Sequence, residues 1–285
     1  MNDLVLHPAT RRQTELFIKS PAQVLIIAGP SGSGKLTLAK RLAEAVLELP
    51  KNNFDGYGQS IMVGAADGKA IGIESARQLE RFTRLKVPSA KPYNRAAIIE
   101  DAHLMTVEAQ NALLKTLEEP PEGTLIIMTV SHEPALLPTV RSRAQSLAVQ
   151  RPDQQSLAEF FAGRGFSEED IYKIYTLAGG LPGLMNALLE NDDHPLKLAT
   201  EQARGLLTQP LYERLVTVDG LSKDRTLAID TVAVLQRMAR ISLQNAAGKS
   251  AQRWQKVLEA SYQAAEALNA SAQPKLALTN LALQF

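Results

Sequence analysis

Apolar positions in the first half of the chain alternate between short runs typical of buried strands and longer stretches with helical spacing. Four apolar runs predict strands, at residues 24–28, 60–63, 96–99 and 125–130. Between these runs, apolar residues at helical intervals predict three helices, at residues 36–49, 73–82 and 107–119. Strands that alternate with helices in this way are typical of a parallel sheet flanked by helices. We therefore expect an α/β domain over residues 1–150.

Beyond residue 150 the strand pattern ends, and apolar residues keep helical spacing to the end of the chain. Helices are expected at 157–162 and 168–178, within a small helical domain that spans residues 151–192. A polar break at 191–195 then precedes an all-helical domain over residues 193–285. The helical segments expected in this last domain cover residues 196–218, 225–245, 252–269 and 274–283.

A glycine-rich turn, residues 29–35, joins the first predicted strand to the first predicted helix. Glycine lets consecutive backbone N–H groups point inward, and a helix N-terminus beside them favours an anion. The turn fits the phosphate-loop (P-loop) pattern G-x-x-x-x-G-K, with Lys35 as its lysine. The predicted nucleotide-binding residues here are Gly29, Pro30, Ser31, Gly32, Ser33, Gly34, Lys35, Leu36 and Thr37. The alternative is a loop that merely joins strand to helix, and Lys35 at the one critical place argues against it.

The residue after this lysine departs from the pattern. A serine or threonine usually follows the lysine and binds magnesium, whereas Leu36 stands here and the hydroxyl comes one place later, on Thr37. A helix turns about 100° per residue, so Thr37 does not simply replace the missing ligand, although it could touch a phosphate nearer the sugar. The sequence therefore predicts a site for ATP or ADP and leaves magnesium binding open.

Two adjacent carboxylates, Glu100 and Asp101, end the third predicted strand. In P-loop nucleotidases an acid at this strand end reaches the magnesium shell, and a neighbouring acid can orient or deprotonate the attacking water. In P-loop ATPases aspartate usually precedes glutamate, whereas here the order is reversed and Asp101 stands at the position of the base. An aspartate side chain is shorter than a glutamate side chain by about 1.5 Å, and a positional error of that size can lower the rate on the order of 100-fold. The alternative is a helix start with two solvated acids. Ser131, after the fourth strand, stands where it could sense a γ-phosphate.

Composition narrows the remaining possibilities. The chain has 285 residues, 45% of them apolar, which is enough for sizeable cores, and a net charge of +1 that gives no global attraction to nucleic acid. The absence of cysteine excludes disulfides, thiol catalysis and a cysteine-based zinc site, and the four histidines are too far apart for a local metal motif. Without an apolar run of about 20 residues we expect no membrane span and a cytoplasmic location.

Three segments of the chain together resemble bacterial clamp-loader subunits of the AAA+ class. They are Ile-Glu-Asp-Ala-His at 99–103, the run from Glu108 to Pro121, and Leu-Pro-Thr-Val-Arg-Ser-Arg at 137–143. In that family a Ser-Arg pair followed by cysteine supplies an arginine finger to the ATP of the adjacent subunit. Ser142 and Arg143 match this motif, and Ala144 replaces the cysteine. The resemblance implies a finger role for Arg143, and the alternative is a surface arginine at a helix start.

The segment Gly180-Leu181-Pro182-Gly183 indicates which kind of clamp-loader subunit the chain resembles. ATP-hydrolysing subunits usually present an arginine here, whereas this opening is similar to that of the delta-prime subunits of the DNA polymerase III clamp loader. Together with Leu36 and the reversed acids, this implies an ATPase activity of its own that is weak or absent. Some relatives carry a zinc module with four cysteines, and its absence here implies that no zinc is bound.

The resemblance also implies domains and partners. Residues 151–192 correspond to a lid and 193–285 to a collar through which subunits assemble. The expected partners are the motor and delta-type subunits in a pentamer of the DNA polymerase III holoenzyme, the sliding clamp, and primed DNA reached through the complex. Five basic collar residues are expected to form a solvated face: Arg237, Arg240, Lys249, Arg253 and Lys256.

Two alternatives stay open from the sequence. The first is an active ATPase, similar to the clamp-loader motor subunit or to archaeal replication factor C small subunits, in which Thr37 and Asp101 function despite their placement. The second is a stand-alone P-loop kinase or nucleotide switch, which would work as a monomer and need an acceptor pocket of its own.

Overall fold

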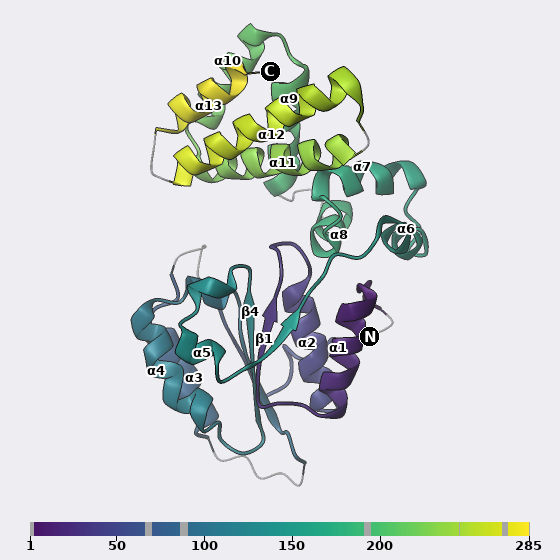
Figure 1. Ribbon diagram of the computed structural model, residues 1–285. Coiled ribbons are helices and arrows are strands. Elements are labelled where there is room, and N and C mark those ends of the chain that lie inside the picture. The colour runs from purple at the N-terminus through teal and green to yellow at the C-terminus, as the bar shows by residue number, and fades with distance from the viewer. Residues whose placement is uncertain are drawn as a thin grey trace. The chain divides into compact units, whose positions relative to one another are not determined.

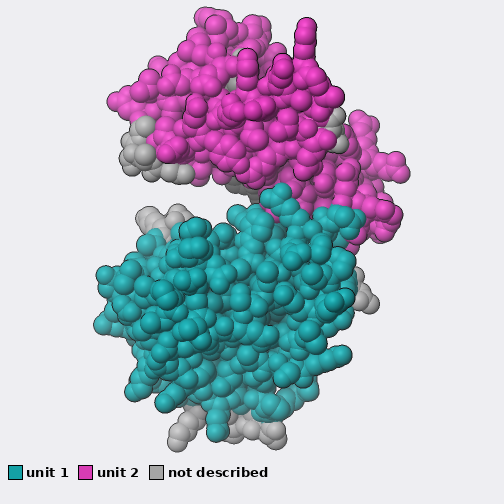
Figure 2. Space-filling view, viewed as in Figure 1, with its two compact units in different colours: residues 1–153 teal, residues 154–285 magenta. Residues whose placement is uncertain are grey.

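The structure is a computed structural model that describes residues 3–65, 70–85, 91–190, 195–244, 246–269 and 273–284. The chain divides into two compact units, which we call the sheet unit, Met1–Asp153, and the helical unit, Gln154–Phe285 (Figure 2). The helical unit covers the predicted collar, 193–285, and the predicted lid, 151–192, except for residues 151–153. The boundary between those two domains therefore stays a prediction.

The sheet unit is built on a parallel sheet with the strand order β2-β3-β4-β1-β5. Its strands are β1 (Val24–Ala28), β2 (Ser60–Val63), β3 (Arg95–Ile99), β4 (Thr124–Val130) and β5 (Gln145–Ala148). The α-helices of the unit are α1 (Pro8–Lys19), α2 (Lys35–Val46), α3 (Ile73–Thr83), α4 (Val107–Glu118) and α5 (Pro138–Arg141). The four predicted strands are confirmed. The edge strand β5 was not predicted, because only Leu147 of its four residues is buried.

Successive residues of the central strands face opposite sides of the sheet and form two cores. Leu25 and Ile27 pack with α1 and α2, while Val24 and Ile26 pack with α3 and α4. Figure 1 shows these two helical layers on the two faces of the sheet. A strand buried on both faces is apolar at most of its positions, which explains the nearly continuous apolar runs in the sequence.

The connection between α2 and β2 is held by a buried carboxylate. Glu44 is 4% exposed, and its Oε1 atom accepts hydrogen bonds from the backbone N–H groups of Asn53 (2.9 Å) and Phe54 (3.0 Å). Its Oε2 atom pairs with Arg41 at 2.9 Å, and the Phe54 ring is buried nearby in the core. The connection is therefore fixed by the hydrogen bonds of Glu44 and by burial of the Phe54 ring.

The helical unit consists of α6 (Gln154–Ala162), α7 (Glu168–Ala178), α8 (Pro182–Glu190), α9 (Pro195–Thr208), α10 (Leu211–Leu221), α11 (Arg225–Gln244), α12 (Gly248–Asn269) and α13 (Pro274–Leu283). The helix α11 packs against α7, α9 and α12, so it links the first helices of the unit to its last ones. The expected helical segment 196–218 is wrong as one helix, because Pro210 separates α9 from α10 and proline cannot continue a helix ladder. None of the described helices is long and apolar enough to cross a membrane.

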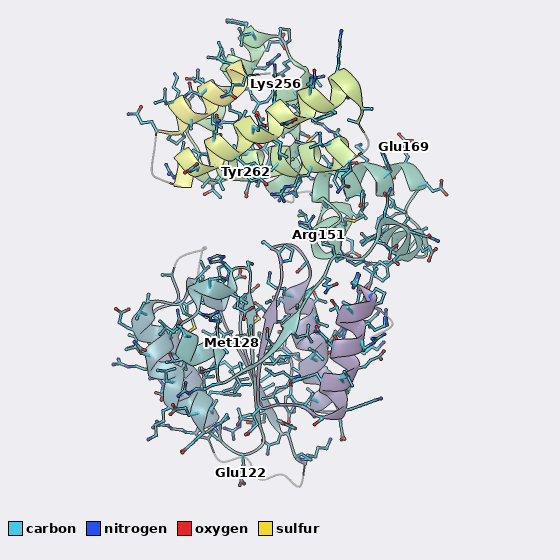
Figure 3. The ribbon with its side chains drawn as sticks, viewed as in Figure 1. Glu122, Met128, Arg151, Glu169, Lys256 and Tyr262 are labelled. Carbon is cyan, nitrogen blue, oxygen red and sulfur yellow. The ribbon has the colours of Figure 1, made fainter. Side chains whose placement is uncertain are left out.

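The predicted solvated face of basic residues is only partly correct. Four of the five are exposed, as expected: Arg240, Lys249, Arg253 and Lys256. Arg237 instead donates from Nε to the carbonyl of Leu177 at 3.3 Å and connects α11 to the end of α7. Arg240 stacks on the Tyr262 ring, labelled in Figure 3, and Arg253 donates to the carbonyl of Leu207. Three of the five cations thus serve contacts within the unit.

Candidate functional site

The P-loop lies between the end of β1 and the start of α2, as predicted. Gly32 and Gly34 have φ values of +78° and +84°, a region that favours glycine because it has no Cβ atom. Gly29 packs so close to the end of the sheet that an added Cβ atom would lie 2.9 Å from the Val149 Cβ atom. The glycines therefore fix both the turn of the loop and its closeness to the sheet.

Lys35 is held inside this loop. The side chain is buried, and Nζ donates to the carbonyl of Pro30 and to Oγ of Ser131, both at 3.0 Å. Burial lowers the pKa of the Lys35 amine, while the charges of Asp101 and Glu100 oppose this shift. The contact between Lys35 and Ser131 thus joins the P-loop to the end of β4.

The loop fits a phosphate group better than a magnesium ion. Ser33 Oγ is buried and has no hydrogen-bond partner among the described residues, as expected of a group that binds a ligand. The Leu36 side chain packs against the core formed with α1 and α2, and Thr37 is exposed. The described residues contain no group of three or more acids or histidines that could hold a metal.

Glu100 and Asp101 lie at the end of β3, beside the P-loop. Asp101 has a φ of +48°, unusual for a residue with a side chain, and its backbone N–H donates to Thr129 Oγ1 at 3.0 Å. Burial first, and then the charge of Asp101, raises the pKa of the Glu100 carboxyl, while Lys40 and Lys35 lower it. The ionised form of the Glu100 carboxyl is therefore disfavoured in the folded protein.

His103 joins this group of side chains and was missed from the sequence. Its Nδ1 atom accepts a hydrogen bond from the Ser131 N–H at 3.4 Å and lies 3.8 Å from Asp101 Oδ1. Thr129, whose Oγ1 atom accepts a hydrogen bond from the Asp101 N–H, was not predicted either. A polar residue inside an apolar strand could have indicated it. The ends of β1, β3 and β4 thus bring Lys35, the two acids, Ser131 and His103 to one place.

Replacing Glu100 by glutamine is expected to stabilise the sheet unit at neutral pH. Because its pKa is raised in the folded protein, the ionised carboxyl is less favourable there than in the unfolded chain. The wild type loses stability as the pH rises through the ordinary pKa towards the folded value, and Glu100→Gln removes this loss. Thermal unfolding at about pH 3.5 and pH 7 tests this. The gain in Tm should be present at pH 7 and disappear in acid, and a gain that grows in acid contradicts it.

Arg143 lies at the opposite end of the parallel strands from this site. It comes two residues before β5, in which Gln145 pairs with Leu25 near the start of β1. Four residue steps, from Leu25 to Gly29, separate that level from the P-loop by about 13 Å along the strand. In Figure 3 the label of Arg151 marks the end of the strands near the P-loop, and the label of Glu122 marks the opposite end. The structure therefore brings Lys35, Ser131 and the two acids together, places Leu36 against the core, and keeps Arg143 apart.

A family model described as "DNA polymerase III, delta subunit" matches residues 10–153, the whole of the parallel sheet and its helices. The chain belongs to this family. Subunit tau of DNA polymerase III from Bacillus subtilis is 31% identical over 166 residues, which cover 53% of this chain and 29% of tau. Subunit delta' from Pseudomonas aeruginosa is 29% identical over 181 residues, 56% of this chain and 54% of delta'. The matches thus span about half or less of these relatives.

The family is that of clamp-loader subunits, and the fold agrees with it. A gamma subunit-related protein of DNA polymerase III from Thermotoga maritima superposes with a TM-score of 0.59 at 21% identity, covering 96% of this chain and 97% of that one. At this identity the likeness shows the fold alone. The predicted α/β fold of the AAA+ type is therefore confirmed, and a helical unit follows it.

Proposed function

We propose that this clamp-loader family member is a delta-prime-like subunit that helps to load the sliding clamp onto primed DNA during replication. Its main catalytic contribution is Arg143, given to the ATP site of the neighbouring subunit. The observation that carries this proposal is the position of Arg143, at the end of the strands opposite the chain's own P-loop. An arginine at this position is too far from its own P-loop to contact a nucleotide bound there, so in this proposal it acts on the ATP of another chain.

The chemistry of such a contribution is electrostatic. In phosphoryl transfer, negative charge spreads over the oxygens of the γ-phosphate, and a guanidinium beside them stabilises that charge. Arginine fingers contribute on the order of 10³ to 10⁵ in turnover in NTPases that use one. Arg143 needs only its guanidinium for this role, so Ala144 in place of cysteine does not remove it.

The chain's own site fits a binding role more than a hydrolytic one. Lys35, Ser33 and the glycine turn fit the phosphates of ATP or ADP, which would supply the bound anion there. Leu36 provides no hydroxyl for magnesium, and Asp101 occupies the place of the usual longer glutamate. Leu181 and Leu184, both buried at the opening of α8, take the place of an arginine that would touch nucleotide. These features support a weak or absent ATPase.

The proposed setting is a cytoplasmic pentamer with motor and delta-type subunits. In it, residues 151–192 act as the lid and 193–285 as the collar that joins the subunits. Contact with the clamp and with DNA then occurs through the complex, in keeping with a net charge of only +1.

An active ATPase is the second candidate, because Lys35, Ser131, His103 and both acids do meet at the strand ends. Turnover by the isolated chain that Lys35→Ala abolishes would favour it. For the proposed function, size-exclusion chromatography of the chain with partner clamp-loader subunits should show a stable larger complex. A chain that stays monomeric among those partners would instead favour a stand-alone nucleotide switch.

A further inference from the structure

The guanidinium of Arg143 is held by two groups from different parts of the sheet unit. Nε donates to Oε1 of Glu118 at 2.9 Å, and Nη2 donates to the same oxygen. Nη1 donates to the carbonyl of Thr139 at 2.7 Å and has a long contact of 3.4 Å to Ser142 Oγ. Glu118 is the last residue of α4, whereas Thr139 lies in α5. One guanidinium thus bridges the ends of two helices.

These contacts leave part of the guanidinium able to bind a ligand. An arginine carries five N–H donors, and the contacts to Glu118 use one on Nε and one on Nη2. The second N–H of Nη2 has no partner among the described residues. The Arg143 side chain also remains 30% exposed. The pair therefore fixes the direction of the guanidinium and still leaves a donor for a phosphate oxygen.

We infer that Glu118 is a positioning residue that holds Arg143 ready for the neighbouring subunit's ATP. This inference rests on the proposed finger role of Arg143. An exposed ion pair adds little stability, typically about 0–1 kcal/mol, so orientation is the effect to expect from it. An arginine has many rotamers, and fixing them before the reaction avoids an entropy cost at the moment the transition state forms.

The same ion pair could instead inhibit the reaction, by keeping Arg143 away from the phosphate. A carboxylate competes with a phosphate for the same guanidinium, and a pair that had to break first would slow the reaction. The contacts favour positioning, because Nε and Nη2 share a single Glu118 oxygen, which leaves the second N–H of Nη2 without a partner among the described residues. The two effects have opposite signs in the experiment.

The test uses the clamp loader reconstituted with this chain, in which ATP hydrolysis is measured with clamp and primed DNA. Glu118→Ala should lower kcat about tenfold and leave the KM for ATP within about twofold, because the change acts on orientation in the transition state. Glu118→Gln should fall between the alanine variant and the wild type, since its amide oxygen still accepts the Nε bond. In the double variant with Arg143→Ala, removal of Glu118 should cause no further loss.

Glu119→Ala is the matched control, since Glu119 is the next acid along, is also exposed, and forms no ion pair among the described residues. It should keep the wild-type kcat. If Arg143→Ala lowers turnover but Glu118→Ala does not, or raises it, the positioning role is overturned and the finger stands. If neither change has an effect in an assembled loader, the finger and its positioning are both overturned.

Discussion

Replacing Arg143 by alanine is expected to lower the ATP turnover of the reconstituted loader at least about tenfold, with assembly intact. The guanidinium stabilises charge that develops only in the transition state, so kcat should fall more than the affinity for ATP. Arg143→Lys should recover little, because a lysine ammonium has a different shape and cannot keep the contacts to Glu118 and Thr139 together. Clamp- and DNA-stimulated hydrolysis measures the effect.

The matched control for this prediction is Arg141→Ala. Arg141 ends α5, is exposed, and carries the same charge two residues earlier. It should leave turnover within about twofold, because the proposed finger role belongs to the Arg143 guanidinium and an exposed charge outside that role contributes little. Equal losses for both arginines would show a general charge effect, and no loss for Arg143→Ala would make that residue structural.

Replacing Gln110 by leucine is expected to destabilise the sheet unit by about 3 kcal/mol. Gln110 is 2% exposed, and its Nε2 atom donates to the carbonyls of Met105 and Ala135, both at 3.2 Å. Its Oε1 atom accepts from the Leu137 N–H at 2.7 Å. Leucine fills a similar volume but leaves three backbone groups unpaired, and each buried unpaired group costs about 1–3 kcal/mol unless water reaches it.

A loss of this size corresponds to a fall in Tm of about 6–12 °C for a unit of this length. Asn111→Leu is the control on the same helix, and as an exposed site it should change stability by less than about 0.5 kcal/mol. Thermal unfolding of both variants by circular dichroism gives the comparison. Equal Tm values for Gln110→Leu and the wild type would mean that the three bonds contribute no net stability.

The sequence predicted the parts of the fold that local pattern determines. Strands such as β1 and β4 are buried on both faces, so nearly all of their residues are apolar and the run is visible without a structure. The edge strand β5 has no such signal, because one of its sides is open to solvent. The break at Pro210 was available from a single residue and was overlooked within a continuous helical pattern.

In the candidate site, too, the residues predicted from the sequence are those that a local pattern indicates. Lys35, Glu100, Asp101 and Ser131 follow strands, and the parallel order of the sheet brings the ends of those strands together. His103 and Glu118 were not predicted, because each forms a hydrogen bond with a residue that is remote in the sequence, Ser131 and Arg143 respectively. The pairing of Glu118 with Arg143 joins positions 25 residues apart, and neither periodicity nor a motif encodes such a contact.

The most direct test of the account is a clamp-loading assay on primed DNA, using partner clamp-loader subunits with and without this chain. We expect loading to require the chain, to be restored by the Lys35→Ala variant, and to stay low with Arg143→Ala. That result would mean that the chain acts through the arginine it gives to a neighbour and not through hydrolysis at its own P-loop. Equal loading without the chain, or full loading with Arg143→Ala and none with Lys35→Ala, would contradict the account.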